Sequence, residues 1–372
     1  MSAPTHPRSR PRLRDLGIVL GELSPGPLNA ITDVPGVRVG QTTLISGSGP
    51  LVPGQGPIRT GVTAILPHEG NPLLEKVPAA VHVINGAGEV TGRSLVEEWG
   101  LLETPICLTN TLNVGLVYDA VIEWMARTTG ALSVDEWSIP MVAECYDGYL
   151  NDIQGRHVHT EHVLAALESA DGGPVAEGSV GGGTGMTCYQ FKGGNGTSSR
   201  VVETAGGRWT VGALVQANHG ARHDLRIGGL PAGTLLADAP LPGRRQDGSI
   251  IIVLATDAPL DAHQLRRLAS RGALGLARTG STARNGSGDF TIAFSNHPAN
   301  RVAPLARGAP RTLITLQNED MTRLFNAAVE SVEEAILNAL CAADDMVGRD
   351  DHFVAGLPVE RVRALWQAHH LA

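Results

Sequence analysis

Aromatic and positively charged residues are scarce in this chain. Aromatic residues make up 4% of its 372 residues, the formal net charge is −8, and the only lysines are Lys76 and Lys192. Nucleic-acid binding needs a concentrated basic surface, so we expect no nucleic acid as a partner. The one basic cluster consists of Arg8, Arg10, Arg12 and Arg14, which we expect to form a solvated N-terminal arm. The 46 glycines indicate that small residues and tight turns carry much of the packing.

Long apolar runs are also lacking. No stretch reaches the roughly 18–20 apolar residues that span a bilayer, and no apolar segment follows the start, so we expect neither a membrane anchor nor a signal peptide. The four cysteines are far apart and form no C-x-x-C pair, which weakens a zinc or redox interpretation; they are Cys107, Cys145, Cys188 and Cys341. Reduced thiols in a cytoplasmic protein are the simplest expectation.

Strands and helices alternate along the chain. Short runs rich in β-branched residues predict strands at Gly61–Leu66, Ala80–Ile84, Pro140–Ala143, Trp209–Ala217, Ser249–Ala255 and Asp289–Phe294. Helical patterns cover Val114–Arg127, Glu161–Ser169, Asp261–Leu276 and Asp320–Ala342. The third helix opens like a capping box, with Gln264 three residues after Asp261.

The last of these helices is predicted to be amphipathic. Its apolar face comprises Leu324, Ala328, Val332, Ala335 and Ala339, and the other faces carry Glu330, Glu333 and Glu334. Such a helix covers one face of a sheet.

The sequence does not match several familiar motifs for nucleotide binding, metal binding or catalysis. The glycine-rich stretch Gly178–Gly185 fits neither G-x-G-x-x-G nor a P-loop, so we expect a close backbone crossing or a bend there. His157, His159 and His162 are spaced like metal ligands, but they stand at a predicted helix start, and we expect no metal site. No serine lies in a G-x-S-x-G elbow, although a triad using His219 or His223 stays open.

One Gly-Ser pair has a distinctive context. The segment Ala239–Gly248 combines prolines, glycine and charges, and it leads directly into the apolar run Ile250–Leu254. If the chain were cut between Gly248 and Ser249, the serine would carry a free α-amine at a fixed strand end. An α-amine has a pKa of about 7.7–8.0, so it can take the hydroxyl proton and activate the serine without a histidine. A simple turn is the alternative, since Gly-Ser occurs at four other places in the chain.

The order of motifs resembles the L-aminopeptidase/D-amidase-esterase (DmpA-type) family, which includes the β-peptidyl aminopeptidases. The matching segments are TDVPGVRVGQTTL, TGVTAILPHEGN, LTNTLNVG, VAECYDGYLNDI, GSVGGGTGMTCYQFKGG, ALVQANHG, DGSIIIVLATDAPL and NGSGDF. The resemblance implies a single α/β domain over 1–372, a four-layer αββα sandwich like the Ntn-hydrolases but with different connectivity. It also implies self-cleavage into 1–248 and 249–372, assembly into a homo-oligomer of α/β heterodimers, and no metal or organic cofactor.

The resemblance also assigns roles to individual residues. Ser249 matches the nucleophile, Asn218 matches a donor to the oxyanion, and Tyr146 matches a tyrosine whose hydroxyl helps to bind it. Ser287 matches a second serine close to the nucleophile. Asp289 stands where the β-peptide-cleaving members have glutamate, and Glu144 is the candidate for binding the ammonium group of the substrate.

These assignments predict a self-processing serine aminopeptidase that removes N-terminal residues from small peptides, amides and esters. The alternatives are a β-peptidyl aminopeptidase, an ornithine-acetyltransferase-like acyltransferase, and a non-catalytic binding protein of the same fold. The shorter Asp289 predicts preference for small L-amino acids, with D-residues accepted in some amides or esters.

Overall fold

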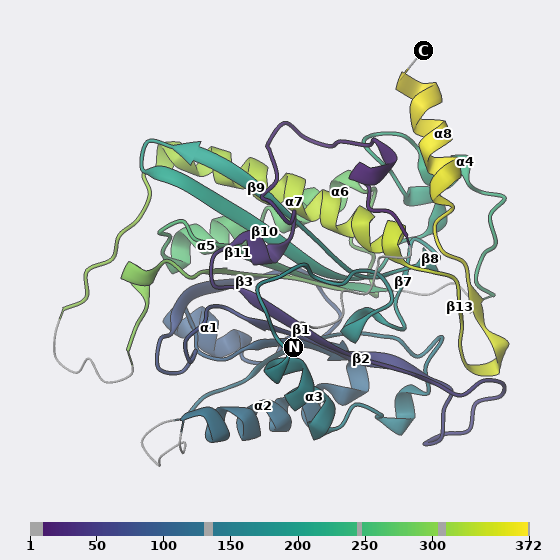
Figure 1. The fold of residues 1–372 in the computed structure, drawn as a ribbon, viewed down its shortest axis with the longest axis horizontal. Helices are drawn as coiled ribbons and strands as arrows, with labels where there is room; N and C mark the ends of the chain where they lie inside the picture. Colours follow the sequence, from purple (N-terminus) through teal and green to yellow (C-terminus); the bar gives the residue numbers. More distant parts are fainter. Residues whose placement is uncertain (1–9, 130–136, 244–247, 304–309, 371–372) are drawn as a thin grey trace.

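Two β-sheets lie face to face between two layers of helices in the computed structural model (Figure 1), which describes residues 10–129, 137–243, 248–303 and 310–370. The smaller sheet has the order β1-β2-β5-β6, formed by Arg38–Ser46, Ile58–Leu66, Ile106–Asn110 and Met141–Cys145. The larger sheet has the order β4-β3-β12-β11-β10-β9, formed by Leu101–Leu102, Val77–Gly86, Gly288–Ser295, Ser249–Thr256, Gly207–Asn218 and Gly194–Thr204. The predicted four-layer αββα architecture is confirmed.

Helices cover the outer face of each sheet. The smaller sheet packs against α2 (Val114–Thr129) and α3 (Thr160–Glu168). The larger sheet packs against α5 (Ala262–Ala269) and α7 (Met321–Ala342), and α6 (Gly272–Arg278) packs against α7. Three separate apolar clusters fill the three spaces between the four layers. The remaining elements include α1 (Arg93–Trp99), α4 (Ala232–Leu235), α8 (Val359–His370) and the short hairpins β7-β8 (Thr187–Cys188, Phe191–Lys192) and β13-β14 (Met346–Val347, Phe353–Val354).

Each predicted strand and helix is present, but one predicted helix is divided into two. The predicted helix Asp261–Leu276 is two helices, α5 and α6, separated at Ser270 and Arg271. The bend lets α5 lie on β3 and β12 while α6 turns toward α7. Gly272 sits at the bend, where a Cβ would lie 2.3 Å from Thr291 Oγ1. The predicted capping box is confirmed, because Asp261 Oδ1 accepts a hydrogen bond from Gln264 N at 2.8 Å.

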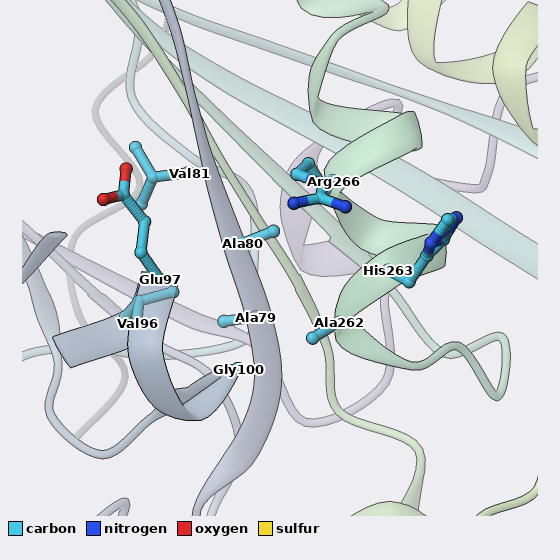
Figure 2. A pocket seen from close by; sticks show the side chains of 9 residues that line it. All are labelled: Ala79, Ala80, Val81, Val96, Glu97, Gly100, Ala262, His263 and Arg266. Atoms are coloured by element: carbon cyan, nitrogen blue, oxygen red, sulfur yellow. The ribbon is translucent and has the colours of Figure 1, made fainter. Parts of the chain in front are cut away.

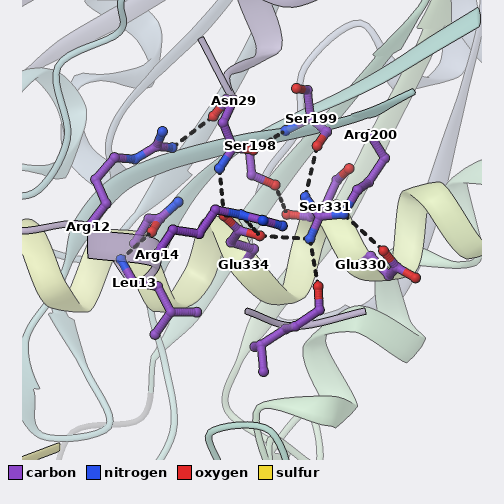
Figure 3. A network of polar contacts seen from close by, with 12 residues as sticks. Arg12, Leu13, Arg14, Asn29, Ser198, Ser199, Arg200, Glu330, Ser331 and Glu334 are labelled. Atoms are coloured by element: carbon purple, nitrogen blue, oxygen red, sulfur yellow. Dashed lines mark hydrogen bonds and ion pairs between the residues drawn. The ribbon is translucent and has the colours of Figure 1, made fainter. Parts of the chain in front are cut away.

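The predicted apolar face of α7 is confirmed, because its five residues are fully buried, but the three glutamates outside that face do not point to solvent. All three are buried, and Glu334 is completely enclosed. Arg200 from β9 donates to Glu330 Oε2 at 2.9 Å and to Glu334 Oε2 at 2.7 Å (Figure 3). Burial by itself would raise the pKa of Glu334, but Arg14 and Arg200 hold that pKa below its usual value. The charged face of α7 therefore lies against a polar strand.

The prediction of a solvated N-terminal arm is wrong for the described arginines. Arg14 Nε lies 2.8 Å from Glu334 Oε1, and Arg12 donates to the carbonyl oxygens of Asn29 and Thr197 at 2.8 and 2.6 Å. Arg10 donates to the Cys341 carbonyl oxygen at 2.9 Å. These contacts fasten the start of the described chain to α7 and β9. Arg8 lies outside the described residues.

The glycine-rich stretch is the close backbone crossing that its sequence predicts. Gly181–Gly183 form a 3₁₀ turn that contacts both sheets. A Cβ on Gly182 would lie 2.5 Å from the Leu108 carbonyl oxygen, and one on Gly183 would lie 2.3 Å from Asn195 N. Only glycine allows the backbone to pass this closely between β5 and β9.

Candidate active site

Ser249 is the first residue of β11, where the predicted loop meets the predicted strand. Residues 239–243 and Gly248 belong to no helix or strand, and residues 244–247 of that loop lie outside the described part. In the sheet, Ser249 pairs with Asn218 of β10 on one side and with Gly288 of β12 on the other. The sheet therefore fixes the serine between two segments that carry three of the other predicted site residues, Asn218, Ser287 and Asp289.

The hydroxyl of Ser249 is available for chemistry. Ser249 is 5% exposed, and its buried Oγ makes no hydrogen bond of normal geometry within the described residues, apart from a weak interaction with the Cys145 thiol. Buried hydroxyls normally have a partner, so an unpartnered one is typical of a reactive or ligand-binding atom. Cys145 lies beside it, and burial raises the pKa of that thiol, which disfavours a competing thiolate.

Only glycine fits immediately before this serine. A Cβ at Gly248 would lie 1.8 Å from the Asn218 carbonyl oxygen and 2.6 Å from the His219 Cα. The backbone at the Gly248–Ser249 bond therefore packs closely against the end of β10.

A cavity of about 380 Å³ opens at this strand end. Among the predicted site residues, Ser249, Glu144 and Tyr146 line it together with Gly248. Thr111 and Glu89, which sequence analysis did not single out, line it as well. Thr111 lies in the segment LTNTLNVG, which carries the family resemblance, whereas Glu89 lies outside every such segment, and only the fold brings the two residues to the serine.

Glu144 presents a fixed carboxyl group to this cavity. It lies at the end of β6, where its Oε1 accepts a hydrogen bond from Glu89 N at 3.1 Å and its Oε2 accepts one from Thr111 Oγ1. Burial raises the pKa of Glu144, and the two donors counteract this by favouring the ionised form. A carboxylate held in this way can receive a substrate ammonium group.

Tyr146 and Asn218 are joined through the backbone. Asn218 Nδ2 donates to the Tyr146 carbonyl oxygen at 3.0 Å, and its Oδ1 accepts from Thr187 N at 2.7 Å. The second N–H of the amide has no hydrogen-bond partner within the described residues, and Asn218 is the strand partner of Ser249. Tyr146 is 47% exposed and lines the cavity.

Ser287 and Asp289 form a buried pair at the start of β12. Ser287 Oγ donates to Asp289 Oδ1 at 2.5 Å, and the same oxygen accepts from Ile250 N at 3.1 Å. Asp289 Oδ2 is buried without a partner within the described residues. Burial raises the pKa of Asp289 to about 6, a value that suits proton transfer near neutrality.

The histidines of the H-x-H-x-x-H segment lie apart from this site. His157 Nε2 is 2.9 Å from Asp152 Oδ2, and His159 precedes α3, where its N–H donates to His162 Nδ1 at 3.0 Å. Within the described ranges, no group of three or more histidine, cysteine or acidic side chains is arranged to hold a metal ion.

A second, smaller cavity of about 190 Å³ lies between α1 and α5 along β3 (Figure 2). It contains Glu97, His263 and Arg266 but none of the predicted site residues. Its lining comes from β3, α1 and α5, and Ala79 of β3 pairs with Phe294, at the opposite end of β12 from Gly288, the partner of Ser249.

The layered fold and the serine at a central strand end define an Ntn-hydrolase-fold serine aminopeptidase. The chain matches the model of Peptidase family S58 over residues 29–354 and belongs to that family. It is 48% identical to the β-peptidyl aminopeptidase BapA of Sphingosinicella microcystinivorans, over 95% of this chain and 91% of that protein.

Solved structures agree with this assignment. The L-aminopeptidase D-Ala-esterase/amidase of Ochrobactrum anthropi, described as a variant of the Ntn-hydrolase fold, matches with a TM-score of 0.91 and 45% identity over 97% of this chain and 99% of its own. A β-aminopeptidase of Burkholderia sp. matches with a TM-score of 0.88 and 48% identity over 96% and 98%.

The predicted family, fold class and enzyme class are therefore confirmed. The chain is a hydrolase of the aminopeptidase type with an N-terminal serine nucleophile, and its family is a peptidase family rather than one of acyltransferases or binding proteins. Within the described residues, no helix is long and apolar enough to cross a membrane.

Proposed function

We propose that the chain cuts itself between Gly248 and Ser249, giving fragments 1–248 and 249–372, and that Ser249 then hydrolyses small peptides, amides and esters at their N-terminal residue. The observation that carries this proposal is the unpartnered Oγ of Ser249, held at the first position of β11 and facing a cavity. In self-cleavage, Oγ attacks the Gly248 carbonyl carbon, the peptide nitrogen leaves as the Ser249 α-amine, and water hydrolyses the resulting ester.

Substrate hydrolysis repeats the same chemistry. Ser249 Oγ adds to the scissile carbonyl carbon while its proton passes to the free α-amine. The free N–H of Asn218 and the Tyr146 hydroxyl stabilise the oxyanion, with one such donor worth about 3–4 kcal/mol. The proton then moves to the leaving group as its bond to carbon breaks. Water attacks the acyl-enzyme and releases the N-terminal residue with a carboxyl group.

Three acidic or hydroxyl groups complete the site. Glu144 binds the substrate ammonium, since its carboxylate lines the cavity and is oriented by two hydrogen bonds. Ser287 and Asp289 lie next to the serine strand, and Asp289 Oδ2 supplies a free acceptor for the new α-amine of Ser249.

We assign the substrate class as small L-amino acids such as alanine or glycine, with D-residues accepted in some amides or esters. Asp289 is shorter than glutamate by roughly one C–C bond, about 1.5 Å. A site that fixes both the ammonium and the carbonyl discriminates against an inserted backbone carbon, and misplacement of about 1 Å can cost roughly 100-fold in rate.

A β-peptidyl aminopeptidase is the second candidate, because a relative at 48% identity carries that name. Values of kcat/KM for L-alanine and β-homoalanine p-nitroanilides distinguish the two. We expect faster turnover of the L-alanine compound, whereas faster turnover of the β-compound would assign the chain to the second candidate.

Two further properties belong to this proposal. The four cysteines are buried and free, which fits a reducing compartment, and we assign the enzyme to the cytoplasm. We also assign it a homo-oligomeric assembly of α/β heterodimers.

The proposed activity is tested by the hydrolysis of L-alanine p-nitroanilide by the purified protein, which should be lost in Ser249→Ala. Wild-type turnover by that variant would refute the assigned nucleophile.

A further inference from the structure

Glu89 brings a second carboxylate to the active-site cavity. It lies in the loop between β3 and α1, its side chain is exposed, and it lines the same cavity as Ser249 and Glu144. No ion pair involves Glu89 in the part of the chain that the structure describes. The mechanism of acyl transfer does not use this charge.

The backbone of Glu89 is fixed with respect to the reacting groups. Its N–H donates to Glu144 Oε1 at 3.1 Å, and Ala87 N donates to the Ser287 carbonyl oxygen at 3.3 Å. Between them, Gly88 packs so tightly that a Cβ there would lie 3.0 Å from Gly288 Cα and 2.9 Å from Glu144 Oε1. Glu89 therefore belongs to a loop that packs against the start of β12.

The charges around the cavity are unbalanced. Glu89 and Glu144 both contribute a carboxylate, and no described residue that lines the cavity carries a positive charge. Burial is the main cause of the raised pKa of Glu144, and the charge of Glu89 raises it further, so the two groups interact. The ammonium of an aminopeptidase substrate neutralises one of these charges and leaves the other.

We infer that Glu89 is a specificity-determining residue: among N-terminal residues of similar size, it makes the site favour a positively charged side chain and disfavour a carboxylate. This rests on the proposed function, in which Glu144 receives the ammonium. Because the N–H of Glu89 holds that same carboxylate, the Glu89 side chain starts next to the N-terminal residue of the substrate rather than next to its leaving group.

The experiment compares p-nitroanilides of three N-terminal residues of similar size: L-2,4-diaminobutyrate, L-asparagine and L-aspartate. With wild-type enzyme at low salt, kcat/KM should decrease in that order. An exposed charge pair is worth about 0.2–1 kcal/mol, which changes affinity by about 1.4-fold to fivefold per unit charge. Because the two compounds differ by two charge units, the ratio of the diaminobutyrate to the aspartate compound should fall by about twofold to 25-fold in Glu89→Gln.

Salt supplies a second readout. At about 1 M salt the screening length is about 3 Å, so the wild-type ratio should approach that of Glu89→Gln. Glu168→Gln is the matched control, because Glu168 is an exposed glutamate at the end of α3 on the outer layer, and its ratio should equal that of wild type.

Two results would overturn the inference: a ratio that Glu89→Gln leaves unchanged, or a wild-type enzyme that cleaves L-alanine p-nitroanilide but shows no preference for positive charge. Failure to cleave L-alanine p-nitroanilide would instead count against the proposed function, so the two failures are distinguishable.

Discussion

Asn218 and Ser249 are direct partners in the antiparallel pairing of β10 with β11. The pairing holds a side-chain amide beside the first residue of a buried strand, and the amide is oriented by the Tyr146 carbonyl oxygen and by Thr187 N. An amide fixed before the reaction can stabilise an oxyanion without reorganisation.

The first prediction concerns this amide. Asn218→Asp keeps the size of the side chain and the acceptor for Thr187 N, but it removes the N–H donors. We expect kcat at pH 8 to fall about 100-fold to 1000-fold with little change in KM, because the lost contact forms in the transition state. Steady-state kinetics with L-alanine p-nitroanilide measures both constants. A kcat within a few-fold of wild type would remove Asn218 from the oxyanion site.

Glu144→Gln should act mainly on substrate binding. Glutamine keeps the shape and can still accept the hydrogen bond from Glu89 N, but it carries no charge for the ammonium. A hydrogen bond to a charged group is worth about 1.5–3 kcal/mol, so kcat/KM should fall about 10-fold to 100-fold, chiefly through KM. Thr111→Val keeps the charge and loses one orienting donor, so its loss should be smaller. Equal losses in the two variants would show that orientation rather than charge matters at Glu144.

Asp289 should make stability depend on pH in the uncut chain. Its folded-state pKa of about 6 lies above the ordinary 3.8, because burial disfavours the ionised form. The stability that protonation provides is fully present below about pH 4 and is lost as the pH rises through about 6. The buried charge therefore costs roughly 3 kcal/mol at pH 8.

Asp289→Asn should relieve that cost. In a Ser249→Ala background, which keeps the chain intact, the Asn variant should unfold a few degrees higher than its parent at pH 8, and the difference should vanish toward pH 4. Differential scanning calorimetry at both pH values measures it. A difference that is independent of pH would show that Asp289 stays neutral, or stays ionised, throughout this range.

Chelators should leave activity unchanged. His157 is paired with Asp152, and His162 Nδ1 accepts the His159 N–H, so two of the three histidines already use ring nitrogens in local contacts. Assays with and without EDTA test this expectation. Activity lost with EDTA and restored by zinc would contradict it.

Sequence patterns predict the fold where hydrophobic periodicity is strong. Strands β2, β10, β11 and β12 and helices α2, α3 and α7 lie where apolar patterns place them, within a few residues. Strand β9 was missed, because its segment GNGTSSR carries small polar residues instead of an apolar pattern. Those residues are buried all the same, since Arg200 bonds to two glutamates of α7 and Ser198 donates to the Ser331 carbonyl oxygen of the same helix. Long-range ion pairs leave no local signal in a sequence.

The site was predictable only in part for a similar reason. Ser249 is marked by a loop that enters an apolar strand, and the family motifs supply the other assigned residues. The contacts of Thr111 and Glu89 with Glu144 join segments more than 30 residues apart in sequence. They depend on how β3, β5 and β6 are placed relative to one another, which only the folded chain reveals.

The central claim is that one serine both frees its own α-amine and performs hydrolysis. Intact-mass measurement of the purified protein tests it most directly, with Ser249→Ala and Ser48→Ala as a matched pair, because Ser48 also follows a glycine but is exposed. Wild type and Ser48→Ala should each give two chains corresponding to 1–248 and 249–372. Ser249→Ala should give one inactive, full-length chain with a mass close to the 38.9 kDa of the uncut sequence. A single full-length wild-type chain that retains aminopeptidase activity would contradict the account.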